Sequence, residues 1–157
     1  MEFRVRSARL TDVDPAIRII LRDDRGDSGQ RRADADRLRS LLFLPSATVV
    51  VAEAEHAVVG IGVLSIRPSV RSGPFVGTID ELGLGLARGR SRSAAAAADA
   101  ALRDQIGTSI VEQLIASARN KGCARVDVTD PIATTESALL KGSGFARRGP
   151  LLSRPTE

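Results

Sequence analysis

Apolar residues recur at two different spacings along the chain, and these spacings predict where strands and helices lie. Alternation with a period of two, or a short continuous apolar run, predicts strands at residues 3–8, 48–54, 58–66, 76–84 and 123–128. Apolar residues three or four positions apart predict helices at residues 11–21, 31–44, 106–121 and 134–141. A two-residue turn at Glu55-His56 joins two strands, and Gly144-Phe145 opens a last strand toward Leu152. The order βααβββαβαβ predicts an α/β fold with a mixed, mostly antiparallel central sheet and helices on both faces.

The strongest helical pattern follows Gly107, where apolar residues recur every four positions from Ile106 to Ala118. We interpret Gly107 as a tight turn, since Ser109 and Glu112 have the spacing of a capping box for a helix that begins there. The first amides of a helix carry the positive end of its dipole, so such a turn is able to hold a phosphate. The alternative is an ordinary loop before a core helix, and one glycine taken alone favours that alternative.

A segment of unusual composition precedes this helix, at residues 86–105. It contains the basic run Arg88–Ser93 and then, from Ala94 to Ala101, seven alanines and Asp99. Alanine has a high helix propensity, but the run offers no strong apolar stripe for docking. We expect a helical or partly disordered insertion on the surface of a single domain that spans residues 1–157.

Composition narrows the classes of function. The net charge of +4 comes with no Trp or Tyr and four Phe, which disfavours a nucleic-acid binder built on aromatic stacking. The single Cys123 excludes an internal disulfide, and with His56 as the only histidine a hydrolytic triad or a metal site is not expected. No apolar run is long enough to cross a bilayer, and no signal segment opens the chain, so we expect a cytoplasmic protein.

Several local motifs, taken in this order and at this spacing, resemble those of the GNAT N-acetyltransferase superfamily. They cover nearly the whole chain. The residues that carry the resemblance are Arg6–Asp12, Val51–Glu53 with Val59-Gly60, Asp80–Leu82, Ile106–Thr108, Ala118–Cys123 and Gly144-Phe145.

The resemblance implies a cofactor and a reaction. In that family a turn before a helix binds the pyrophosphate of acetyl-CoA, the pantetheine arm pairs with a splayed fourth strand, and an amine attacks the thioester directly. The residues that this assigns to acetyl-CoA here are Leu82, Leu84, Arg103, Gln105, Ile106, Gly107, Thr108 and Ser109. The expected acceptor is a small-molecule amine or a peptide or protein amine, and the oligomeric state is left open between monomer and homodimer.

Glu81 is the candidate catalytic base. Alternation along its strand places Ile79, Glu81, Gly83 and Gly85 on one side, where the glycines would leave open space beside the carboxylate. A partly desolvated carboxylate is able to accept a proton from an ammonium nucleophile. The alternative is a strand-end acid paired with an arginine, and the two interpretations are about equally supported.

The chain departs from the family pattern at the phosphate-binding turn and at the residue that protonates the leaving thiolate. Gln105 and Leu102 stand where the family has a glycine and a Gln or Arg, and Leu140 stands where a tyrosine often protonates the leaving thiolate. Gly107 also lies 23 positions after Leu84. In the family, only a few residues connect the fourth strand to the phosphate-binding turn. A second class of function therefore stays open, a non-catalytic GNAT-fold module that binds a ligand or partner.

Overall fold

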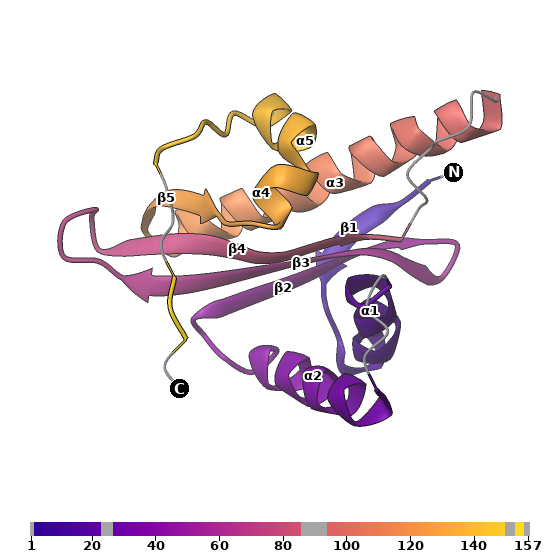
Figure 1. Ribbon diagram of the computed structural model, residues 1–157, viewed down its shortest axis with the longest axis horizontal. Helices are drawn as coiled ribbons and strands as arrows, with labels where there is room; N and C mark the ends of the chain where they lie inside the picture. The colour runs from indigo at the N-terminus through magenta and orange to yellow at the C-terminus, as the bar shows by residue number, and fades with distance from the viewer. Residues whose placement is uncertain (1, 23–26, 86–93, 150–152, 156–157) are drawn as a thin grey trace.

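A computed structural model describes residues 2–22, 27–85, 94–149 and 153–155, and it contains one five-stranded sheet (Figure 1). The strands are β1 (Arg4–Ser7), β2 (Ala47–Ala54), β3 (Ala57–Pro68), β4 (Phe75–Leu84) and β5 (Cys123–Val128). They lie side by side in sequence order. The first three pairs are antiparallel and the last, β4 with β5, is parallel. The predicted class, a mixed and mostly antiparallel sheet with helices, is confirmed.

Helices cover both faces of this sheet (Figure 1). On one face lie α1 (Val13–Ile20), which follows a short 3-10 turn, and α2 (Ser28–Leu41). On the other lie α3 (Ala94–Asn120), α4 (Ile132–Thr135) and α5 (Ser137–Gly142). Each face buries its own apolar layer, because alternate residues of the central strands point to opposite sides.

The layer under α3 is the larger of the two. Its fully buried side chains include Ile106, Ile110 and Leu114, which the four-residue spacing predicted. These side chains lie close to the sheet because β3 has glycines beneath them. A Cβ built on Gly62 would lie 2.5 Å from Cγ2 of Ile110, so the helix could not approach this closely over an alanine.

Several predicted boundaries are wrong. Helix α2 ends at Leu41 rather than residue 44, and the single helix predicted at residues 134–141 is two helices, α4 and α5. Helix α2 begins at Ser28 rather than residue 31, because the Asp27 carboxylate accepts a hydrogen bond from the Gln30 amide at 2.8 Å and caps it. Gly144 and Phe145 do not open a strand: Gly144, at φ +89°, ends α5, and the Phe145 amide donates to the Leu140 carbonyl at 3.0 Å. Residues 145–149 are irregular, and 150–152 lie outside the described residues.

The insertion predicted at residues 86–105 is not a separate piece in the part that the structure describes. Residues 86–93 lie outside it, while residues 94–105 form the first half of α3 and continue into the core helix without a break. Helix α3 extends well past the edge of the sheet (Figure 1). None of the helices within the described ranges has both the length and the apolar character to span a bilayer.

Candidate active site

The candidate site is centred on an irregularity in strand β4. Leu64 of β3 lies opposite Ile79 and its neighbour Val63 lies opposite Glu81, so Asp80 is an extra residue that forms a β-bulge. Ile79 is buried in the layer under α3, whereas Val63, and with it Glu81, belongs to the side of α1 and α2. The prediction that Ile79 and Glu81 share a side is therefore wrong, because alternation is interrupted between them.

Strand β4 is also where the sheet separates. Its pairing with β5 runs from Phe75 to Ile79 and stops there, as β5 ends at Val128. From Asp80 to Leu84 the edge of β4 that faces away from β3 has no strand partner among the described residues. The free edge leaves backbone N–H and C=O groups able to bind an extended ligand.

The Glu81 side chain is exposed on the α1 and α2 side of the sheet. Protein atoms around the carboxyl remove part of its water, and the carboxylates of Asp80 and Asp34 lie nearby, so the pKa of Glu81 is raised. Asp34 is on α2, and sequence reasoning missed it because nothing in the periodicity of a polar helix indicates which strand it approaches. The Asp80 side chain has its own hydrogen-bond partner, because its carboxylate accepts a hydrogen bond from the Ser65 hydroxyl.

The open space predicted beside Glu81 is not found at the two glycines. A Cβ built on Gly83 would lie 2.9 Å from Cγ2 of Ile19, and one on Gly85 would lie 3.1 Å from the Val59 carbonyl oxygen. The glycines let α1 pack closely against the end of β4. They shape the wall beside the carboxylate and do not leave it empty.

The tight turn predicted at Gly107 is not found. Gly107 lies inside the continuous helix α3, so its amide is not one of the free amides of a helix start. A Cβ at this position would lie 2.3 Å from Cδ1 of Leu139 and 3.0 Å from Cδ1 of Leu84. The glycine therefore allows α5 and the end of β4 to pack against α3.

The other residues assigned to acetyl-CoA are divided between two sides of α3. Gln105, Thr108 and Ser109 line an open groove of about 460 Å³ together with Phe3 and Asp104. Ile106, Leu82 and Leu84 point into the core, so only their backbone atoms are available to a ligand. The carboxylate of Asp104 makes the groove unfavourable for a phosphate.

Arg103, expected to reach a phosphate, is instead buried in an ion pair. Its two terminal nitrogens lie 2.6 and 3.2 Å from the carboxylate oxygens of Glu136, between α4 and α5. Sequence reasoning missed Glu136 because the partners are 33 residues apart and no local motif links them. Leu140, at the position of the family's tyrosine, is buried in the same layer.

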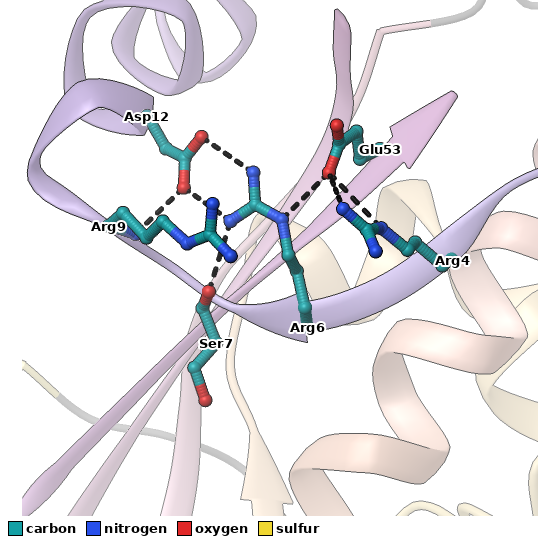
Figure 2. A network of polar contacts seen from close by, with 6 residues as sticks. All are labelled: Arg4, Arg6, Ser7, Arg9, Asp12 and Glu53. Atoms are coloured by element: carbon teal, nitrogen blue, oxygen red, sulfur yellow. Dashed lines mark hydrogen bonds and ion pairs between the residues drawn. The ribbon is translucent and has the colours of Figure 1, made fainter. Parts of the chain in front are cut away.

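A second polar network connects β1 to the start of α1 (Figure 2). Arg6 lies at its centre: its guanidinium donates to Asp12 at 2.7 and 3.0 Å and to Glu53 at 2.8 Å. Asp12 also accepts from the Arg9 amide, and Arg4 donates to Glu53. The hydrogen bonds from Arg6 lower the pKa of both carboxyl groups. These are residues of the first two motifs in the family resemblance, and here they fix the edge of the sheet.

Residues that could hold a metal do not converge: within the described ranges no three His, Cys, Asp or Glu side chains form such a group. Cys123 lies in β5 at the edge of the core, where burial raises the pKa of its thiol. The thiol is therefore a poor nucleophile, and the described residues offer two exposed carboxylates, Asp80 and Glu81, on the open strand edge.

No protein-family model matches the chain, and no curated protein matches its sequence. Solved structures do match it in fold. Glucosamine-6-phosphate N-acetyltransferase from Arabidopsis thaliana is 16% identical, with a TM-score of 0.73 and 100% of both chains covered. The aminoglycoside N-acetyltransferase AAC(6')-Iy, solved with CoA, is 16% identical at TM-score 0.73, covering 99% of this chain and 95% of that one. The ribosomal-protein-alanine N-acetyltransferase of Brucella melitensis biovar Abortus 2308 is 14% identical at TM-score 0.65, with 99% of each covered.

Proposed function

We propose, from the premise that this chain has the fold of the GNAT N-acetyltransferases, that it transfers an acetyl group from acetyl-CoA to a primary amine. The observation that carries the proposal is the separation of β4 from β5 next to Glu81. An extended thioester arm pairs with the free edge of β4 from Asp80 to Leu84, and the bulge directs the Glu81 carboxylate to the opposite face. The thioester then lies along the edge of β4, and the acceptor amine approaches it from the side of α1 and α2, where Glu81 lies.

The proposed reaction needs one proton acceptor and no nucleophilic side chain. An amine near neutral pH is mostly protonated, so Glu81 removes a proton before or during attack. The amine nitrogen forms a bond to the thioester carbon while the carbon–sulfur bond breaks, and the second proton of the nitrogen passes to water. With Leu140 buried where the family has its tyrosine, the thiolate takes a proton from water.

The acceptor is a small, positively charged amine in this proposal. The carboxylates of Glu81, Asp80 and Asp34 give the α2 side of β4 a negative charge, which favours a cation there. Fold neighbours are named as N-acetyltransferases of glucosamine 6-phosphate, of aminoglycosides and of ribosomal-protein alanine.

The test is a titration of the protein with acetyl-CoA followed by an assay for released thiol. The amine panel contains glucosamine 6-phosphate, an aminoglycoside and a peptide with N-terminal alanine. We expect acetyl-CoA to raise the melting temperature by mass action and at least one amine to release thiol. Absence of binding at millimolar acetyl-CoA would contradict the proposal.

The second candidate is a non-catalytic module with the same fold. The observation that favours it is helix α3, which runs through Gly107 where a cofactor turn was expected. This candidate predicts a protein that binds acetyl-CoA weakly or not at all and releases no thiol with any amine. The same titration and assay therefore separate the two candidates.

A further inference from the structure

Exposed apolar side chains gather at one end of the sheet. Of the five large ones among the residues that the structure describes, Leu10 lies before α1, and the other four lie in the segment before β2 and in the hairpin from β3 to β4. These four are Phe43, Leu44, Val70 and Phe75. Val70, in the turn of the hairpin, is fully exposed, and Phe43 is 72% exposed. Single exposed apolar residues are common, whereas a group in adjacent segments indicates an interaction surface.

Two hydrogen bonds hold three segments together at this end. Lys121, which follows α3, donates from Nζ to the Pro45 carbonyl oxygen at 3.1 Å, and this bond links the α3–β5 junction to the segment before β2. Arg125, in β5, donates from Nη1 to the Ser72 hydroxyl at 2.6 Å, and this bond links the same junction to the hairpin. The hairpin and the beginnings of β2 and β5 accordingly lie at the same end of the sheet (Figure 1).

The charge of these three segments is strongly one-sided. Residues 43–46, 67–75 and 119–125, which we call the basic end, contain no Asp or Glu. Their exposed cations are Arg67, Arg71, Arg119, Lys121 and Arg125. Arg125 forms an exposed ion pair with Asp127, whereas within the described ranges Arg67, Arg71 and Arg119 have no ion pair. The basic end therefore attracts an anionic partner.

The mixture of apolar and cationic groups distinguishes between two anionic partners. A nucleic acid would contact the arginines through its phosphates but would leave Phe43, Leu44 and Val70 in water. The surface of a bilayer with anionic lipids has phosphates for the cations and, directly beneath them, an apolar layer for the side chains in between. A bilayer also needs no matching hollow, so it suits side chains that project from loops. The composition of the basic end thus favours a membrane surface.

We propose that the basic end binds the surface of a bilayer that contains anionic phospholipids. Val70 and Phe43 enter the interfacial layer, while Arg67 and Arg71 contact lipid phosphates. Strand β4 begins at the basic end, and its free edge from Asp80 to Leu84 lies at the other end of the strand. A chain bound in this way keeps that edge in water. The inference uses no residue assigned to acetyl transfer and does not depend on the proposed function.

The first test is sedimentation of the whole chain with lipid vesicles. We expect the protein to bind vesicles of phosphatidylcholine with about one third phosphatidylglycerol, and to bind pure phosphatidylcholine at least tenfold more weakly. Rising salt should weaken the binding, because it screens the attraction between arginines and phosphates. The double variant Arg67→Gln/Arg71→Gln should bind the anionic vesicles at least tenfold more weakly than wild type.

The matched control is the double variant Arg31→Gln/Arg32→Gln. Both residues are exposed near the beginning of α2, and their loss changes the net charge by the same amount. This variant should bind anionic vesicles nearly as well as wild type. Equal weakening by both double variants would show that net charge alone attracts the protein, and would overturn the inference.

The second test places a fluorescent reporter at the tip of the hairpin. The chain has no Trp, so Val70→Trp gives a single emitting side chain. On addition of anionic vesicles its emission should shift to shorter wavelength, and quenching by acrylamide should fall. Ala57→Trp is the control, because Ala57 is exposed at the opposite end of β3. Its emission should not change.

Three results would contradict a membrane-binding surface. The first is no binding of wild type to anionic vesicles at low salt. The second is an unchanged emission of Trp in Val70→Trp when vesicles are bound. The third is binding of duplex RNA, weakened by Arg67→Gln/Arg71→Gln, by a protein that does not bind vesicles, which would assign the basic end to nucleic acid. Circular dichroism of each variant checks that the fold is retained.

Discussion

Glu81 shows how the environment of one residue decides its chemistry. An exposed carboxylate paired with arginine would have a low pKa and would be a weak base, which was the alternative interpretation of this residue. Here no arginine contributes to the shift; loss of water and two acidic neighbours raise the pKa instead. A carboxylate with a raised pKa is a stronger base at neutral pH.

The first prediction concerns the pH dependence of acetyl transfer. Glu81→Gln keeps the shape of the side chain and removes its basicity, so we expect kcat to fall by about 10²-fold or more with little change in acetyl-CoA affinity. The deficit should shrink as pH rises, because free amine then becomes available without a base. In wild type, the acid limb of the profile should lie above the ordinary glutamate pKa of about 4.3.

The measurement is the pH–rate profile of both proteins with one accepted amine. Asp80→Asn is the companion variant, because it removes a neighbouring charge that raises the pKa of Glu81 but keeps the base, so its acid limb should move to lower pH while its rate at neutral pH stays well above that of Glu81→Gln. Identical profiles for wild type and Glu81→Gln would show that the base is another group or water.

Helix α3 is the element that the sequence predicted least well. Gly107, Ser109 and Glu112 together match the pattern of a helix start, but local pattern is only one contribution. Glycine inside a helix costs about 1 kcal/mol relative to alanine, and close packing against Leu84 and Leu139 offsets that cost. The alanine-rich residues before it favour helix and extend α3 to Ala94. Neither contact partner lies near in sequence, so no local pattern indicates them.

The second prediction tests this packing. Gly107→Ala gains helix propensity but places a Cβ 2.3 Å from Cδ1 of Leu139. We expect a net loss of about 1–3 kcal/mol in the free energy of unfolding, the usual cost of an overpacked core. Leu139→Ala provides space for the new methyl group, so the double variant should be more stable than the sum of the single changes predicts.

Denaturant unfolding of the four proteins gives the coupling energy. Gly142→Ala in α5 is the control, since a Cβ there would meet no atom within 4 Å. It should leave stability equal to or slightly above that of wild type. Additive losses at positions 107 and 139 would mean that the two residues do not contact each other in solution.

At the scale of the whole molecule, strands were easier to predict than the separation between them. The apolar runs of β2, β3 and β4 are buried on at least one face, and the alternation in β1 and β5 matches edge strands. The place where β5 leaves β4 depends on where β5 ends and on the bulge at Asp80. The first depends on pairing between residues more than 40 positions apart, and the second on the register of β3 against β4, and a local pattern contains no signal for either.

The third prediction concerns stability in acid. The pKa values of Asp12 and Glu53 are lowered, chiefly by hydrogen bonds from Arg6, so their contribution to stability is present above pH 4–5 and is lost as pH falls. The raised pKa of Glu81 has the opposite effect on stability. It favours the folded state at low pH, and this contribution is lost as pH rises. Asp12→Asn should therefore cost about 2 kcal/mol at pH 7, and the difference from wild type should shrink as pH falls toward 3.

Thermal unfolding between pH 3 and pH 7 measures this dependence. Asp36→Asn is the control, because Asp36 forms an ion pair with Arg39 in which the side chains are 66% and 41% exposed. Such surface pairs contribute about 0–1 kcal/mol. A constant difference between Asp12→Asn and wild type across this range would show that the carboxylate's charge is not what stabilises the β1 edge.

The bulge in β4 makes this strand tolerant of a change that strands normally resist. Losing one residue from a regular central strand turns every later side chain over to the wrong face. Ile79 and Leu82 are three positions apart, yet both lie in the layer under α3, because Asp80 is extra. With Asp80 deleted, Ile79 would be followed directly by Glu81, and Leu82 and Leu84 would still face α3. A one-residue deletion would therefore straighten the strand while leaving the carboxylate on its own side, which separates the bend of the backbone from the identity of the base.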